Sequence, residues 1–294
     1  MTNNGKIPEV KTVKGFIAKV FELTKKNKLE FFYRGHSNRG KYKLEPSLFR
    51  KGDDGNYLYL DNEHILYREL IVSNSSDFSS DENTLDRLVR MQHYSLPTRL
   101  LDITSNPLIA LYFACKSSFG RKQEDGTYKD EDEGEVILLS MESDNIKYFD
   151  SDAVSCIANL ARLPKHEKDQ IRFLEEGFND QLSIKRLIHL IKEEKSFFES
   201  RIISDDLKKI ICVKGKRSNS RIYSQSGAFL LFGLNATFNE DGNKDIHVKR
   251  ITVKNKGLIL KELDLLNINE STVFPNIENS AKYVAQKYAL NCSN

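Results

Sequence analysis

The chain concentrates polar side chains between residues 91 and 115, a segment flanked by two apolar stretches that are typical of buried helix. The polar side chains of this segment are those of Gln92, His93, Thr98, Arg99, Asp102 and Thr104. An amide, an imidazole, a guanidinium and a carboxylate could together donate and accept hydrogen bonds to a polar ligand. Because the flanking core would hold them rigidly, we expect these side chains to form a site rather than a solvated surface.

Arg34 is a second candidate for ligand contact. It follows the aromatic residues 31–33 and precedes Gly35, so we expect it to emerge at the end of a buried strand, where the backbone can turn close to a ligand. A rigid guanidinium in that place suits a phosphate or a carboxylate. The structural alternative is a buried ion pair, for example with Asp102 or Glu45.

Two members of the polar segment also have structural alternatives. Arg99 could pair with Asp102 and stiffen the turn between them instead of contacting a ligand. His93 stands beside Tyr94 at a predicted helix end, where a neutral imidazole could serve the fold or a site.

Two later clusters contribute further candidates. Residues 219–229 lead into a predicted strand, and the amide of Gln225 could read the edge of an amide or a base, or tie down a loop backbone. Residues 271–279 place Glu278 ahead of the last helix. Its carboxylate could act in a site or favour the N-terminal dipole of that helix.

The hydrophobic pattern predicts the elements that position these residues. Short apolar runs predict strands at residues 31–35, 100–103, 135–140, 210–213, 228–232 and 247–253. Helical spacing predicts helices at residues 10–25, 57–72, 84–94, from 107 onward, and at 257–266 and 281–290, and it predicts that residues 152–200 are helical throughout. Predicted N-caps are Asp81 or Asn83 for the helix at 84–94, Ser105 for the next helix, and Asp180 for the amphipathic run at 182–191.

This order of elements predicts one α+β domain over residues 1–294. We expect a central mixed or split β-sheet with flanking helices, and a helical insertion at residues 152–200. The acidic segment at residues 120–134 is interpreted as a solvated loop.

Composition removes several classes of function. The 45 basic and 42 acidic residues give a net charge of only +3, so bulk charge does not call for nucleic acid. The sequence has no P-loop, GxGxxG, HExxH or GxSxG motif, and its histidines lack metal-ligand spacing, so we expect no metal. The four cysteines are scattered along the chain, which predicts reduced thiols. The sequence shows no leader peptide and no long apolar segment, so we expect a cytoplasmic protein that does not enter a membrane.

Several motifs together resemble the FRG domain, a bacterial and phage family named for a (Phe/Tyr)-Arg-Gly motif. The resemblance extends over most of residues 28–290. The family usually has Gly where Ser95 stands and Trp where Ile103 stands. The motifs are Tyr33-Arg34-Gly35, residues 92–102, residues 106–114, residues 221–229 and Val273-Phe274-Pro275.

The family's order of elements is similar to that of ADP-ribosyltransferases, which hold NAD in a split β-sheet. By order alone, Arg34 would take the first-strand position, Asp102 the second, and Gln225 or Glu278 the third; the chain has no clear Glu-x-Glu motif. This analogy implies catalytic roles for these four residues and nicotinamide stacking by Tyr112 or Tyr94. The residues it implies for NAD binding are Tyr33, Gln92, His93, Thr98, Arg99, Thr104, Asn106 and Tyr112.

The leading functional expectation is therefore an NAD-consuming, ADP-ribosyltransferase-like effector of bacterial toxin or anti-phage type, with a protein or nucleic-acid acceptor and a defence-system or antitoxin partner. A non-enzymatic sensor of a nucleotide or a phage protein is the first alternative. The second is a nucleic-acid-processing effector. It would use the basic residues Lys208, Lys209, Lys214, Lys216, Arg217 and Arg221.

Overall fold

The computed structural model describes residues 7–25, 28–116, 132–173, 176–216 and 227–289. Its described strands form a single mixed sheet of eight, in the order β1-β8-β4-β2-β3-β7-β6-β5. The strands are β1 (Glu9–Val10), β2 (Leu29–His36), β3 (Leu100–Thr104), β4 (Gly134–Glu142), β5 (Ile146–Tyr148), β6 (Ile210–Lys214), β7 (Gly227–Phe232) and β8 (His247–Val253). The pairs β1–β8 and β5–β6 are parallel and the others are antiparallel. The predicted α+β class is confirmed.

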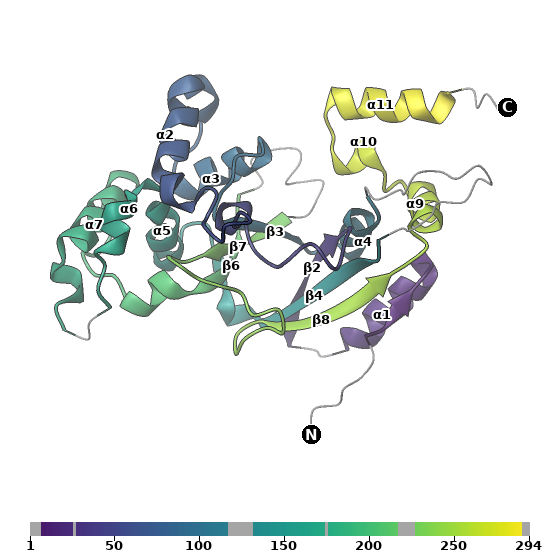
Figure 1. Cartoon of the computed structure of the whole chain (residues 1–294), viewed down its shortest axis with the longest axis horizontal. Helices are drawn as coiled ribbons and strands as arrows, with labels where there is room; N and C mark the ends of the chain where they lie inside the picture. The colour runs from purple at the N-terminus through teal and green to yellow at the C-terminus, as the bar shows by residue number, and fades with distance from the viewer. Residues whose placement is uncertain (1–6, 26–27, 117–131, 174–175, 217–226, 290–294) are drawn as a thin grey trace.

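Two groups of helices lie on either side of the molecule in Figure 1. The first group comprises α2 (Glu63–Ser73), α3 (Thr84–His93), α5 (Asp152–Ala158), α6 (Lys165–Asp169) and α7 (Leu182–Glu194). The second comprises α1 (Val13–Leu23), α4 (Pro107–Cys115), α9 (Lys256–Leu265), α10 (Glu270–Val273) and α11 (Ile277–Tyr288). Apart from α6 and α11, the helices of each group contribute side chains to an apolar cluster of their own, so the helices cover the sheet in two separate parts.

Both clusters lie on the same face of the sheet. Tyr33 of the second cluster pairs with Thr104, and Leu100 pairs with Leu231 of the first cluster. Because side chains alternate along a strand, Leu100 and Thr104 point to one side, and their partners do too. The two helix groups therefore flank the middle of this face, where β2 and β3 meet.

The opposite face carries a third apolar cluster. It includes Phe32, Ile103 and Leu230 from the strands, covered by Leu48 and Phe238 from irregular segments of the chain. This cluster crosses from β2 to β3 and continues to β7.

The predicted strands at residues 31–35, 100–103, 135–140, 210–213, 228–232 and 247–253 are confirmed, each within two residues at either end. Two predicted caps are wrong. Asn106, not Ser105, caps α4, with its Oδ1 accepting from the backbone N–H of Leu108 at 2.9 Å. Asp180 lies in a 3₁₀ turn, and α7 begins after Gln181 without a side-chain cap.

The other predicted helices are confirmed with shifted ends, but residues 152–200 are not helical throughout as predicted. Asn83, one of the two residues proposed, caps α3 by accepting from the N–H of Asp86. The block at residues 152–200 consists of several short helices, and it shares an apolar cluster with α2, α3 and the strands β6 and β7. In the part of the chain that is described, no helix is long and apolar enough to cross a membrane.

Candidate functional site

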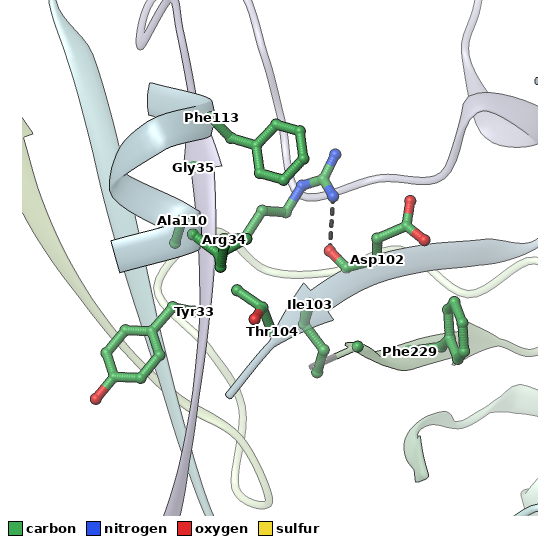
Figure 2. Close-up of a pocket in the computed structure, with 11 residues that line it drawn as sticks. Tyr33, Arg34, Gly35, Asp102, Ile103, Thr104, Ala110, Phe113 and Phe229 are labelled. Atoms are coloured by element: carbon green, nitrogen blue, oxygen red, sulfur yellow. Dashed lines mark hydrogen bonds between the residues drawn. The ribbon is translucent and has the colours of Figure 1, made fainter. Parts of the chain in front are cut away.

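The candidate site lies where β2 and β3 part. In the described structure these strands pair at one position only, Tyr33 with Thr104, and then diverge. A pocket of about 180 Å³ opens at this point, lined by residues of β2, β3, β7 and α4 (Figure 2). Its lining residues are Tyr33, Arg34, Gly35, Asp102, Ile103, Thr104, Ile109, Ala110, Phe113, Gly227 and Phe229.

Gly35 allows α4 to form one wall of the pocket. A Cβ atom at this position would lie 1.9 Å from the carbonyl oxygen of Ala110 and 2.6 Å from the backbone nitrogen of Ala114. No side chain fits there, so the helix packs directly against the backbone of β2. Gly35 thus permits the close approach of the helix, and Arg34 beside it lines the pocket.

Arg34 reaches across the gap between the two strands. Its Nη1 donates to the backbone carbonyl oxygen of Asp102 at 2.6 Å, and its Nε donates to Nε2 of His36 at 3.1 Å. Burial lowers the pKa of Arg34 and the neighbouring Asp102 carboxylate opposes this effect, but a guanidinium remains charged in either case. Figure 2 shows the guanidinium between Phe113 and Asp102.

Asp102 brings a carboxylate to the pocket from β3. The residue is exposed, and its Oδ2 accepts from Nε2 of Gln92 at 3.0 Å. The Oε1 atom of Gln92 in turn accepts from the hydroxyl of Thr98 at 2.6 Å, which fixes the orientation of the amide. Gln92 therefore orients the carboxylate of Asp102, and Thr98 orients Gln92. Neither Gln92 nor Thr98 lines the pocket.

The aromatic side chains of the pocket differ from those expected. Phe113 and Phe229 line it, whereas Tyr112, proposed for stacking on nicotinamide, is buried in the second apolar cluster. Tyr94 is exposed and stacks on His93, with ring centroids 5.0 Å apart. The ring of Tyr33 points away from Arg34 in Figure 2, so this residue borders the pocket without offering its ring to the guanidinium.

Arg99 belongs to the core instead of the pocket. The side chain is fully buried, and its Nε donates to Glu63 at 2.7 Å while Nη1 donates to the carbonyl oxygen of Phe232 at 2.7 Å. Lys168 binds the same carboxylate at 2.5 Å. The proposed pairing of Arg99 with Asp102 is wrong, because the guanidinium is committed to Glu63 of α2.

The other predicted residues are placed as follows. Thr104 lines the pocket and accepts from the N–H of Asn106, which caps α4. His93 lies in the last turn of α3, outside the pocket lining. Glu278 is exposed in the first turn of α11 and does not line the pocket either, which fits the helix-dipole interpretation. Gln225 lies outside the described residues.

His36 is the residue that the sequence interpretation missed. It is buried and accepts the hydrogen bond from Nε of Arg34. The signal was its spacing: residues two apart in a strand point to the same face, so a histidine two residues after Arg34 lies beside it. Among the described residues, no group of three or more His, Cys, Asp or Glu side chains could hold a metal ion.

The fold and pocket define an α+β protein whose candidate site lies between two diverging strands of one sheet. Residues 29–123 match the FRG domain family, and the chain therefore carries an FRG domain. The match is shorter than the resemblance over residues 28–290, yet it contains Arg34, Asp102 and Phe113. No curated protein and no solved structure matches the chain.

Proposed function

We propose that this protein is an NAD-consuming enzyme of ADP-ribosyltransferase or NAD glycohydrolase type. It would act in the bacterial cytoplasm as a toxin or anti-phage effector. The observation that carries this proposal is that Arg34 and Asp102, distant in sequence, line one pocket where a sheet parts. This layout is analogous to the split sheet in which ADP-ribosyltransferases hold NAD, and the analogy rests on the arrangement of elements alone.

Arg34 would bind the pyrophosphate or the nicotinamide ribose. Two of its nitrogens are engaged by the protein, through Nε to His36 and Nη1 to Asp102. Within the described structure, no hydrogen bond from Nη2 to the protein is found, so this nitrogen can donate to a ligand. The two protein bonds would fix the guanidinium before the ligand arrives, which reduces the entropy lost on binding.

Asp102 would stabilise the transition state. In the proposed reaction the bond between C1′ of the ribose and N1 of nicotinamide breaks, and its electron pair leaves with neutral nicotinamide. The ribose then carries positive charge, which a fixed carboxylate stabilises. A nucleophile, either a protein or nucleic-acid acceptor or water, forms the new bond to C1′ and releases its proton to solvent.

The aromatic rings and the size of the pocket suit one end of the dinucleotide. Phe113 and Phe229 could pack against the nicotinamide ring. Ligand pockets for drug-sized molecules are typically about 300–1,000 Å³, and this one measures about 180 Å³. It would therefore hold the nicotinamide end, with the adenosine end outside.

The test is incubation of the purified protein with NAD labelled in the nicotinamide ring and, separately, in the adenine. We expect release of labelled nicotinamide, together with adenine label on an added bacterial protein or nucleic-acid fraction, or free ADP-ribose if water is the acceptor. An Arg34→Ala variant is the control for contaminating activity. No binding of NAD and no nicotinamide release with any fraction would refute the proposal.

A non-enzymatic sensor of a nucleotide or a phage protein is the second candidate. The observation in its favour is that Asp102 is the only acidic side chain among the described lining residues. A sensor needs Arg34 for affinity and has no reaction to lose. Ligand binding that is abolished by Arg34→Ala, with no turnover by the unmodified protein, would identify it.

The basic cluster gives little support to a nucleic-acid effector. Three of its described lysines are paired with carboxylates: Lys209 with Asp206, Lys214 with Glu30 and Lys216 with Glu82. The ammonium of Lys208 lies 3.9 Å from the ring centre of Phe173. Arg217 and Arg221 lie outside the described residues.

A further inference from the structure

Arg34 donates a hydrogen bond to the imidazole of His36, which is buried outside the pocket. His36 is 3% exposed and does not line the cavity. Its Nε2 lies 3.1 Å from Nε of Arg34, and its Nδ1 lies 3.1 Å from Oε1 of Glu135. Because Arg34 can only donate, Nε2 must be the unprotonated nitrogen, and Nδ1–H then donates to the carboxylate.

Glu135 is fixed from its other side. Nη1 of Arg250 lies 2.8 Å from each of its carboxylate oxygens, and Nη2 of Arg250 also bonds Glu240. Burial alone would raise the pKa of Glu135, but its hydrogen bonds to His36 and Arg250 outweigh this effect and lower it. The carboxylate therefore stays ionised and keeps accepting the proton of His36.

The sheet itself sets this geometry. His36 and Glu135 are direct cross-strand partners on β2 and β4, and Arg250 on β8 stands opposite Ile137, two residues along β4. All three side chains therefore point to one face. The relay from Glu240 through Arg250, Glu135 and His36 ends on the guanidinium that faces the pocket.

We propose that His36, which Glu135 orients, is a positioning residue that keeps the guanidinium of Arg34 directed into the pocket. Protonation of the imidazole would break the hydrogen bond between His36 and Arg34 and free the guanidinium to move. The ligand-binding part of this proposal rests on the proposed function, whereas the bond between the two side chains does not. The acceptor lone pair on Nε2 is the feature that matters, because an imidazolium has two donors and no acceptor.

Protonation would also place two cations side by side. The titratable and charged groups around the imidazole are Arg34 on β2, Glu135 on β4, Arg250 on β8 and Tyr42 in the loop after β2, with the Tyr42 ring centre 5.9 Å from that of His36. Burial lowers the pKa of His36; Arg34 and Arg250 also lower it, while Glu135 opposes them. The release of Arg34 is therefore expected on the acid side of the ordinary histidine value.

Two substitutions distinguish the role of His36 as a hydrogen-bond acceptor from the effect of its protonation. His36→Gln retains an acceptor for Arg34 and a donor for Glu135 but does not titrate. His36→Leu removes both groups. Nitrogen-15 NMR of the unmodified protein and both variants, from pH 7.5 down to pH 5, reports the tautomer of His36 and the exchange of Nε–H of Arg34 without any ligand.

We expect the Nδ1–H tautomer at pH 7.5 and a protected Arg34 Nε–H that is lost on acidification, lost in His36→Leu and retained at all pH values in His36→Gln. Calorimetric titration with NAD should show roughly ten-fold weaker binding for His36→Leu at pH 7.5. The affinity of His36→Gln should stay flat with pH where that of the unmodified protein falls.

Two results would overturn the positioning role: an Nε2–H tautomer at pH 7.5, or an Arg34 Nε–H whose exchange does not depend on the imidazole. If NAD does not bind at any pH, the proposed function fails, while the NMR result still decides the role of His36. If His36→Leu does not fold, the pH series on the unmodified protein and His36→Gln gives the same decision.

Discussion

Arg34 and Asp102 are joined across the diverging strands by a hydrogen bond to a backbone atom, from Nη1 to the carbonyl oxygen at 2.6 Å. The carboxylate of Asp102 is not used for this contact. It is held by Gln92 instead and remains in the pocket lining. One residue therefore fixes the cation through its main chain and offers an anion through its side chain.

Replacing Arg34 by lysine should weaken NAD binding although the charge is kept. An ammonium has a single nitrogen and cannot reach His36, the carbonyl of Asp102 and a ligand in the directions that a guanidinium serves. We expect a loss of roughly ten-fold or more in affinity, measured by calorimetry. Arg50→Lys, at an exposed position outside the pocket lining, is the matched control and should bind as the unmodified protein does.

Asp102→Asn should separate binding from chemistry. The amide has the same shape and its oxygen can still accept from Gln92, but it no longer carries the negative charge that stabilises the ribosyl cation. Nicotinamide release should fall roughly 100-fold, while the Kd for NAD changes little. Asp144→Asn, in an exposed turn, should leave the rate unchanged. An unchanged rate in Asp102→Asn would exclude Asp102 as the stabilising group.

Gly35→Ala should destabilise the fold because the added methyl meets the backbone of α4. With contacts of 1.9 and 2.6 Å to main-chain atoms, the helix must move away from β2. Overpacking of this kind costs about 3 kcal/mol, measurable as a lower midpoint in urea unfolding. Gly40→Ala is the control: its Cβ would meet one side-chain oxygen at 3.5 Å, and its midpoint should not change.

Glu63→Gln should lower the free energy of unfolding because it breaks the buried ion pairs of Glu63 with Arg99 and Lys168. It removes the charge that Arg99 and Lys168 share in the core, which leaves two buried cations and typically costs about 3–5 kcal/mol. Burial would raise the pKa of Glu63, but Arg99 and Lys168 outweigh it and hold the pKa below 4.5.

The stabilisation from Glu63 is therefore present above pH 4.5 and is lost as the pH falls through the lower folded value. Urea unfolding should show a deficit in the variant at pH 7 that narrows at acid pH. A deficit that stayed constant through the acid range would contradict this account. Glu82→Gln, at an exposed surface pair, should match the unmodified protein at pH 7.

His36 should make the stability of the protein depend on pH in a different range. Its folded pKa lies below the ordinary value of 6.5, so the unfolded chain binds the proton more readily than the folded one. The contribution is complete above pH 6.5 and decreases as the pH falls towards the folded pKa. The free energy of unfolding measured from pH 7.5 to pH 5 should fall less steeply for His36→Gln. Identical slopes would contradict this assignment.

The sequence predicted β4, β6 and β7 because each is a run of apolar residues buried along most of its length. It predicted β2, β3 and β8 from shorter apolar stretches. It missed β1 and β5, which have two and three residues and no periodicity to detect. It misplaced caps by one residue, since Ser105, Asn106 and their neighbours are all competent caps and the backbone conformation selects among them.

The site was predictable as far as it depends on strand ends. Arg34, Asp102 and Thr104 come together because β2 and β3 are neighbours. The partner of Arg99 was not predictable, because Glu63 lies on a helix whose packing onto the sheet is set by the whole first cluster. Phe113 replaces Tyr112 at the pocket because the rotation of α4 follows from its contact with Gly35, which helical spacing alone does not reveal.

The parting of β2 and β3 gives this sheet two internal edges. At the outer edge of a sheet, backbone N–H and C=O groups lack a strand partner. Here the edges of the two strands border a cavity within the sheet, and Arg34 spans it to the carbonyl oxygen of Asp102. A ligand between these edges would be recognised by main-chain atoms, whose pattern of donors and acceptors does not change when side chains are substituted. Part of the selectivity of the pocket would then be a property of the strand geometry itself.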